Sequence, residues 1–487
     1  MTTFAFAPYD QVWLVFISFA MLLYCWHDAS ANKALWFGWV FGVGLQCGGV
    51  GWIYYSMHVH GGGSVFFSSM VILLLAAYLS IYLGLSGYVV NRFCRASTAI
   101  KLLVLYPLSF ASFEWMQGFV LTGFSWMQVG YTQIELPLSG YAPILGNHAV
   151  GAFVIMMSGV LVYVLDRRAL RTISPKKIMI GVIAIWLIGF GLKQLHWTQV
   201  DGEEIKVSLV QANIAQKQKW VRSNRQPTLK LYRELTLKNL DSDVIVWPET
   251  AIPGYQHQFK SYIQSLADLT QNNETEILLG VFIKNIETGR YYNSVIDLNG
   301  NDYRKRHLVP LGEFVPLRFL IEYFNQWMNI PMSDIASGDV NQDLMTVAGY
   351  PVGVSICFED AFARDVRRDL PAARYLVNVS NDAWFEDSRE PHQHHAIARM
   401  RALESGRYML RATNTGITSI IGPHGEEIAV APQFETAVLN GKIKPLKGAT
   451  PYIYWGDWML LVICVFGIGY FVWHGSKIGT SPARNRQ

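Results

Sequence analysis

Residues 352–360, Val-Gly-Val-Ser-Ile-Cys-Phe-Glu-Asp, place a cysteine directly after an apolar run. The run 352–356 has the length and the β-branched composition of a buried strand. The end of such a strand is where α/β folds expose reactive side chains, and Cys357 lies there. This stretch therefore predicts an α/β domain with a thiol at a strand end.

Similar patterns extend on both sides of this stretch. Strands are predicted at 205–210, 243–247, 276–282 and 375–379, each rich in β-branched residues. Helical patterns lie between them: Tyr262, Leu266 and Leu269 recur at helical spacing, and residues 395–408 are rich in Arg, Ala, Met and Leu. We interpret residues 199–450 as one α/β domain.

Long apolar runs flank this domain, and each is close to the roughly 20 residues that a helix needs to cross hydrocarbon. They lie at 11–27, 35–57, 65–90, 99–120, 147–165, 178–196 and 455–474. The composition agrees, since 51% of residues are apolar and only 16% are charged. We predict a transmembrane domain at 1–198 with about six helices, and a last helix and cytoplasmic tail at 451–487.

The charged loops predict the orientation, because Lys and Arg near helix ends tend to stay in the cytoplasm. The basic residues of alternate loops are Lys33, Arg92, Arg95, Lys101, Arg167, Arg168, Arg171, Lys176, Lys177, Lys477, Arg484 and Arg486. The intervening loops at 58–64 and 122–148 hold none. The domain at 199–450 is therefore predicted to be extracytoplasmic.

The same alternation places Met1 outside, with no charged signal before the first helix. We expect an upstream helix to be missing from this sequence. The net charge of +4 is too small and too dispersed to indicate a nucleic-acid partner.

Cys357 is the one cysteine in the predicted α/β domain, since Cys25, Cys47, Cys94 and Cys464 lie in or beside membrane segments. Disulfides persist outside the cytoplasm. A lone thiol there is either buried and inert or kept reduced for reactivity, and its position at a strand end favours reactivity.

A thiol that attacks a carbonyl needs a base for its proton and a cation or donors for the oxyanion. Glu249 follows a predicted strand in Val-Trp-Pro-Glu, next to an aromatic residue. Lys305 lies in the run Tyr-Arg-Lys-Arg-His at 303–307. Taken singly, each is weak evidence, because a Glu or Lys of this kind is usually a solvated surface charge.

The order of the surrounding motifs is more specific. They are WPE (247–249), YRKRHLVPLGEFVP (303–316), ICFED (356–360), NVSNDAW (378–384) and ARMRALE (398–404). With these motifs, residues 205–440 resemble the nitrilase superfamily, which has an α-β-β-α sandwich. Together with the flanking helices, nearly the entire chain resembles the apolipoprotein N-acyltransferase family.

The resemblance implies roles for particular residues. Glu249 would be the general base, Lys305 the oxyanion stabiliser and Cys357 the nucleophile, with Glu313 supporting them. It also implies supporting roles for Glu359, Phe358 and Trp220. The chain departs from the family pattern at Phe358, where the family often has Tyr, and in having about seven helices where the family has eight.

The implied reaction is a ping-pong acyl transfer without cofactor or metal. Cys357 would take an acyl chain from a phospholipid, typically phosphatidylethanolamine, and the thioester would pass it to the amine of diacylglyceryl-cysteine on an apolipoprotein. Two alternatives stay open from the residues alone: a membrane-tethered amidase with the same triad, and a membrane protein with a degenerate domain.

Other features have structural interpretations. His392, His394 and His395 are predicted to pack in a polar loop rather than to bind a metal. Glu114 is either functional or interfacial, and residues 61–63 suit a flexible loop. An apolar run forms either domain core or a membrane-dipping arm; its members are Phe319, Leu320, Ile321, Tyr323, Phe324, Trp327, Met328, Ile330 and Met332.

Overall fold

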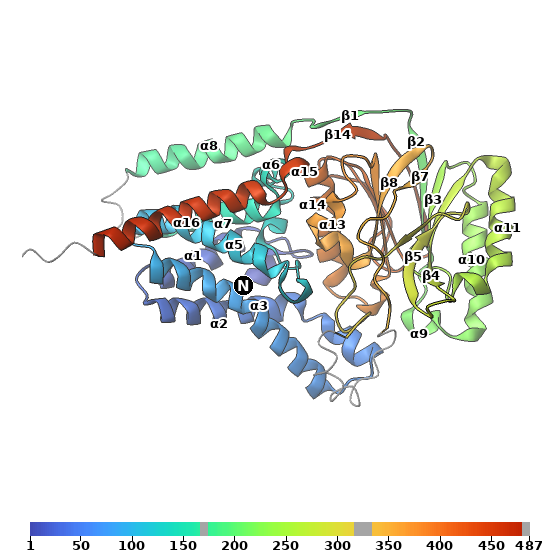
Figure 1. The fold of residues 1–487 in the computed structure, drawn as a ribbon, viewed down its shortest axis with the longest axis horizontal. Coiled ribbons are helices and arrows are strands. Elements are labelled where there is room, and N and C mark those ends of the chain that lie inside the picture. The colour runs from blue at the N-terminus through green and yellow to red at the C-terminus, as the bar shows by residue number, and fades with distance from the viewer. Residues whose placement is uncertain (166–173, 316–333, 480–487) are drawn as a thin grey trace, which may run out of the picture. The chain divides into compact units, whose positions relative to one another are not determined.

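The computed structural model describes residues 1–165, 174–315 and 334–479, so the apolar run at 319–332 lies outside the described residues. The chain forms two compact units. The first, here called the membrane unit, comprises Met1–Gly51, Ser69–Leu195 and Tyr454–Gln487. The second, here called the sheet unit, comprises Trp52–Ser68 and His196–Ile453. Figure 1 colours both units along the chain.

The membrane unit consists of helices at the positions of the predicted apolar runs. They are α1 (Trp13–His27), α2 (Ala31–Val50), α3 (Val65–Phe93, which enters this unit at Ser69), α4 (Thr98–Ile100), α5 (Tyr106–Gln117), α6 (Ala142–Leu145), α7 (Asn147–Leu165), α8 (Pro175–Lys193) and α16 (Trp458–Gly479). A π-helical segment, Lys101–Leu105, joins α4 to α5.

Four helical segments among the described residues are long and apolar enough to cross a membrane: Val65–Phe93, Thr98–Gln117, Asn147–Leu165 and Pro175–Lys193. Trp13–His27 and Trp458–Trp473 are apolar but shorter. In α8, Ile180 is 67% exposed and Leu187 is 65% exposed. Such an apolar surface would be costly in water, and it suits contact with lipid.

Helix α2 ends earlier than the predicted run of 35–57. It stops at Val50. Gly48, Gly49 and Gly51 weaken the helix there, because glycine loses more conformational entropy on folding than any other residue. A π-helical turn, Tyr55–His60, follows. Residues from Trp52 onward belong to the sheet unit.

The sheet unit contains two six-stranded sheets among its described residues. One has the order β13 (Ala437–Ile443), β2 (Ile205–Gln211), β3 (Val244–Val246), β4 (Glu276–Lys284), β5 (Tyr291–Ile296) and β6 (Asp302–Arg304). The other has β12 (Glu427–Val430), β11 (Ser419–Ile421), β10 (Met409–Thr413), β9 (Tyr375–Ser380), β8 (Tyr350–Ile356) and β7 (Met345–Val347). A separate pair joins β1 (Thr198–Val200) to β14 (Leu446–Gly448). All five predicted strands are confirmed.

The strands that matter for the site run parallel. β2, β3 and β4 are parallel in the first sheet, and β8, β9 and β10 are parallel in the second. The outer strands pair antiparallel to them. Parallel neighbours bring their carboxyl ends to one edge of each sheet, which is where α/β folds place their sites.

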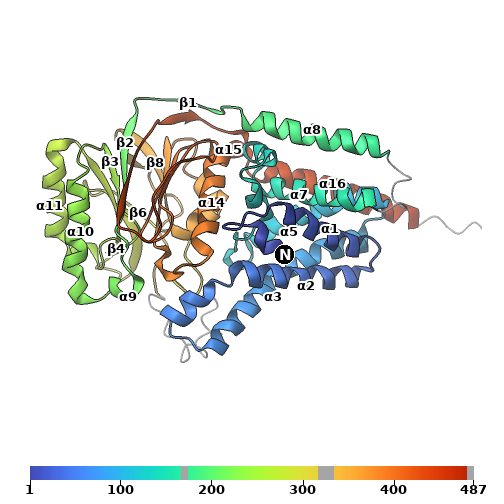
Figure 2. The same cartoon turned by 180° about the vertical axis from the view of Figure 1, so that it is seen from behind.

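The two sheets pack face to face around one apolar core. Val246 and Leu209 of the first sheet share this core with Ile356 and Val377 of the second. Helices cover the outer faces: α10 (Arg225–Leu237) and α11 (Lys260–Thr270) pack on the first sheet, and α13 (Ala363–Arg367) and α14 (Glu390–Ser405) pack on the second. Figures 1 and 2 show these four layers, so the predicted α-β-β-α sandwich is confirmed. The short α9 (Gln216–Lys219) and α15 (Pro451–Trp455) complete the described helices.

Candidate active site

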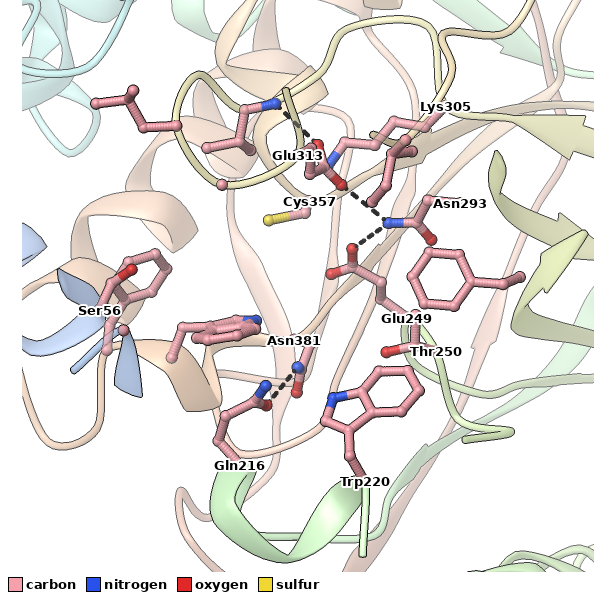
Figure 3. Close-up of a pocket in the computed structure, with 18 of the residues that line it drawn as sticks. Ser56, Gln216, Trp220, Glu249, Thr250, Asn293, Lys305, Glu313, Cys357 and Asn381 are labelled. Carbon is pink, nitrogen blue, oxygen red and sulfur yellow. Dashed lines mark hydrogen bonds and ion pairs between the residues drawn. The ribbon is translucent and has the colours of Figure 1, made fainter. Parts of the chain in front are cut away.

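Three predicted residues meet at one cavity in the sheet unit. Glu249 follows β3, Lys305 follows β6 directly, and Cys357 opens a 3-10 turn, Cys357–Ala361, at the end of β8. All three line a cavity of about 150 Å³. Figure 3 shows their side chains around this space, with Glu313 and Asn293 between Lys305 and Glu249. The predicted triad is therefore brought together from three strand ends.

Cys357 has an unusual backbone. Its φ angle is +53°, in the left-handed region that is uncommon for residues with a side chain. This sharp turn at the end of a strand presents the side chain to the cavity. Burial raises the pKa of the Cys357 thiol to about 12, with a further rise from the charge of Glu249, while Lys305 opposes it. The resting group is thus a thiol that needs a base.

Glu249 is the carboxylate best placed to supply that base. It is 8% exposed, and its Oε1 accepts a 2.6 Å hydrogen bond from Asn293 Nδ2. Burial raises the pKa of Glu249, although Lys305 and the Asn293 hydrogen bond counteract part of the rise. A carboxylate with a raised pKa is a stronger base than an exposed one.

Lys305 is held firmly by Glu313. Its Nζ lies 2.8 Å from Glu313 Oε2 and 2.9 Å from Oε1, and its side chain is 1% exposed. Burial alone would favour the neutral amine, but Glu313, Cys357 and Glu249 raise the pKa of Lys305 above its ordinary value. The ammonium is therefore a fixed positive charge at the cavity wall.

Glu359 faces the protein rather than the cavity. Its carboxylate accepts hydrogen bonds from the main-chain N–H groups of Ile356 (2.7 Å), Arg306 (2.6 Å) and His307 (3.0 Å), and from the Tyr303 hydroxyl (2.9 Å). Burial raises the pKa of Glu359 to about 7, against the effect of Lys305 and these N–H groups. The side chain ties the segment that carries Lys305 to the turn that carries Cys357.

The two aromatic residues of the prediction occupy different places. Phe358 is buried, with its ring 5.0 Å from Phe362 and 5.9 Å from His307, centroid to centroid. Trp220 lines the cavity, and its ring lies 5.9 Å from Phe282. Within the described parts of the chain, its indole Nε1 has no hydrogen-bond partner.

The sequence analysis missed several residues that shape the cavity. Asn293 in β5 links Glu249 to Glu313 through its Nδ2, and a polar residue among the apolar residues of a strand could have signalled it. Ser56 and Met57 also line the cavity, although they lie in a segment that was predicted to be transmembrane. Trp52 anchors that segment, since its Nε1 donates a 3.0 Å hydrogen bond to Gln393 Oε1.

Two other sequence-based interpretations are corrected. His392, His394 and His395 lie in helix α14, not in a polar loop, because the helix already begins at Glu390, with Pro391 in its first turn. Glu114 is buried in the membrane unit, where it accepts a hydrogen bond from the Val129 N–H (2.9 Å) and contacts His148 Nδ1 (3.1 Å). A buried, hydrogen-bonded carboxylate does not fit a side chain that snorkels to the membrane surface. Gly61, by contrast, borders the cavity.

Comparisons with known proteins agree with this architecture. Residues 206–452 match the family model of the carbon-nitrogen hydrolases, and residues 1–160 match that of the apolipoprotein N-acyltransferase N-terminal domain. The chain is 39% identical to an apolipoprotein N-acyltransferase of Methylococcus capsulatus, over 96% of this chain and 92% of that one. The chain belongs to the apolipoprotein N-acyltransferase family. A member of this family from Vibrio vulnificus is 35% identical over 97% of this chain and 95% of its own length.

Solved structures match this chain more distantly. The match with Nit3 of Saccharomyces cerevisiae, a member of the nitrilase superfamily, spans 51% of this chain and 93% of Nit3, at 19% identity and a TM-score of 0.38. The match with a carbon-nitrogen hydrolase of Helicobacter pylori spans 50% of this chain and 90% of that hydrolase, at 17% identity and a TM-score of 0.38. The assignment to the family rests on the sequence matches.

Proposed function

We propose that the protein transfers an acyl chain from a phospholipid to the N-terminal amine of diacylglyceryl-cysteine on apolipoproteins, through a thioester on Cys357. The observation that carries this proposal is the meeting of Cys357, Glu249 and Lys305 at one cavity. Membership of the acyltransferase family supports the choice of reaction. The alternative amidase would use the same three residues with water as the acceptor.

The first half-reaction begins with the thiol. The Glu249 carboxylate accepts the proton of Cys357, and the sulfur attacks the ester carbonyl carbon of the phospholipid. The tetrahedral intermediate then breaks its C–O bond. The leaving alkoxide takes the proton from Glu249 and departs as lysophospholipid, so that the acyl chain remains as a thioester.

Lys305 would stabilise the negative oxygen of that intermediate. Its ammonium is held in place by Glu313 before substrate arrives, so little reorganisation is needed when the charge develops. In the second half-reaction the acceptor amine attacks the thioester carbonyl, and Glu249 accepts a proton from the amine nitrogen. The C–S bond breaks, and the sulfur recovers that proton.

The cavity wall suits a lipid substrate. Met57, Leu311 and Phe385 supply apolar surface at positions along the lining, where burial of an acyl chain is favourable by about 0.8 kcal/mol per methylene group. The indole N–H of Trp220 is a candidate donor to the polar end of the same lipid. Phosphatidylethanolamine is the phospholipid that we propose as donor.

We further propose that the protein lies in the bacterial inner membrane with the region 199–450 in the periplasm, because the basic loops alternate along the sequence. An impermeant thiol reagent applied to intact spheroplasts should label a cysteine placed at Ile286, which is exposed, and not one placed at Lys477. These variants are made in a chain without the five native cysteines. The opposite labelling pattern would contradict the orientation.

The decisive experiment for the reaction is intact-mass measurement after incubation with phospholipid. The full-length protein in detergent should gain the mass of one acyl chain, and an apolipoprotein peptide with a diacylglyceryl-cysteine should then remove it. Cys357→Ala is the matched control and should gain nothing. Release of the acyl chain to water at the same rate without the peptide would support the amidase instead.

A further inference from the structure

The carbonyl oxygen of Cys357 has two side-chain partners. Asn378 Nδ2 of β9 lies 3.2 Å from this oxygen, and His394 Nε2 of α14 also lies 3.2 Å from it. A residue with a side chain stays in the left-handed region only when its surroundings hold it there. These two contacts are therefore part of what positions the nucleophile.

His394 lies in a fully enclosed group of charges, here called the closed cluster: Asp360, Asp382, Glu390, His394 and Arg411. Nε2 of His394 lies 2.9 Å from Asp360 Oδ1. Its Nδ1 lies 3.2 Å from Glu390 Oε1 and 3.5 Å from Asp382 Oδ1. Each side chain of the cluster is at most 1% exposed.

This geometry favours an imidazolium, because both ring nitrogens of His394 face carboxylate oxygens and would act as donors. Burial and Arg411 disfavour the cation, but Asp360 and Asp382 raise the pKa of His394 well above its ordinary value. Burial and the charge of Asp382 raise the pKa of Glu390 to about 7, so that this carboxyl is partly protonated at neutral pH. Three carboxyl groups then face two cations.

A metal ion is the main alternative occupant of this place. Donor atoms of Asp382, Glu390 and His394 lie within 4.8 Å of one another. The guanidinium of Arg411, however, lies 3.1 Å from Asp382 Oδ2 and 3.5 Å from Asp360 Oδ2. It already supplies the positive charge that the carboxylates need, and it would repel a divalent ion.

We propose that His394, as an imidazolium, is a positioning residue for Cys357: it holds the main-chain carbonyl of the left-handed turn, and its charge stabilises the thiolate. The inference rests on the proposed function in that Cys357 is taken as the nucleophile. It adds a second cation, behind the turn, to Lys305 at the cavity wall. His394 contacts the main chain of Cys357 and not the cavity.

The test is the rate of alkylation of Cys357 by iodoacetamide as a function of pH, followed by peptide mass in the full-length protein. His394→Gln keeps an N–H donor but loses the charge. At mildly alkaline pH we expect its rate to fall about tenfold, because a nearby opposite charge shifts a pKa by roughly one unit or more. His394→Lys restores a cation and should recover most of the rate.

Two control variants separate charge from geometry. His395→Gln changes the neighbouring histidine, whose Nδ1 contacts Glu427 instead, and should leave the alkylation rate unchanged. Asn378→Ala removes the other donor to the Cys357 carbonyl without changing the charge. We expect it to slow acyl transfer while its alkylation rate stays within about twofold of the original.

The results distinguish this inference from the proposed function. An alkylation rate in His394→Gln equal to that of the unchanged protein would overturn the role of the charge, even if thioester formation were normal. If His394→Gln does not fold, a slow rate in folded His394→Lys would overturn it equally. One bound zinc per chain that is lost in His394→Gln would also overturn it. Normal alkylation with no thioester in the unchanged protein would contradict only the proposed function.

Discussion

Two groups of charged side chains lie near Cys357, and they differ in whether they border the cavity. The cavity side holds Glu249, Lys305 and Glu313, which line the cavity and are linked by Asn293 and by the Lys305–Glu313 ion pair. The other group is the closed cluster, in which the single side chain of Arg411 contacts three residues: Asp360, Asp382 and Asn378. The difference teaches that the charges available for chemistry line the cavity, whereas the charges that hold the nucleophile are enclosed by protein.

The largest expected effects come from the cavity side. Cys357→Ala should abolish thioester formation, and Glu249→Gln and Lys305→Met should slow it by about 10²- to 10⁴-fold, in line with the loss of a general base or an oxyanion donor. Single-turnover rates with phospholipid measure this. Cys357→Ala should unfold at nearly the original temperature. A Cys357→Ala variant that still acylated an apolipoprotein peptide would contradict the role of Cys357 as the nucleophile.

The closed cluster should respond in stability instead. Arg411→Met removes one of the two cations that face the buried carboxylates of Asp360 and Asp382, and breaking a buried ion pair typically costs about 3–5 kcal/mol. Thermal unfolding should therefore occur at a clearly lower temperature. Lys442→Met is the matched control: it breaks a 2.7 Å pair with Glu204 that is exposed, and it should leave the unfolding temperature unchanged. Equal effects in both variants would show that enclosure does not matter.

A smaller effect is expected at Asn293, which tunes the cavity side. Its hydrogen bond stabilises the Glu249 carboxylate and thus lowers the pKa of Glu249. Without it, in Asn293→Ala, that pKa should rise further. The acid limb of the pH profile of thioester formation should then move to higher pH, because Glu249 must be ionised to act as the base. Asn299→Ala, in an exposed turn, is the control. A limb that stayed in place would show that another group sets it.

The smallest effect is expected from the conservative change Phe358→Tyr, because Phe358 contacts neither group of charges through a polar atom. Its ring packs on Phe362 and His307, so Phe358→Tyr should retain activity. Phe358→Ala removes buried aromatic packing and should lose about 3–5 kcal/mol of stability together with much of the activity. Full activity and unchanged unfolding in the alanine variant would mean that the ring does not support the turn.

The sequence predicted the parts of the fold whose signals are local. The five named strands are short, continuous and apolar, and Glu249 and Cys357 follow two of them, so their positions at strand ends could be read directly. Their meeting with Lys305 came from the family resemblance, because β6 is only Asp302–Arg304 and has no pattern of its own. The structure brings these residues together but leaves their catalytic roles as proposals.

Other parts depend on contacts between distant segments and gave no local signal. β13 includes Asn440, Gly441 and Lys442 and is partly exposed, so its pairing with β2 could not be inferred from apolar spacing. The acidic partners of His394 come from the 3-10 turns Cys357–Ala361 and Asp382–Trp384 as well as from its own helix. A search for metal-ligand spacing along the chain could not detect them.

The segment Trp52–Ser68 belongs to the sheet unit although it lies between α2 and the membrane part of α3 along the chain. Ribosomal synthesis therefore completes one wall of the cavity, with Ser56 and Met57, long before the strands that it joins exist. A truncated protein that starts at His196 would lack this wall, however well its sheets folded. Supplying residues 52–68 as a separate peptide would be the corresponding route to reconstituting the cavity in such a fragment.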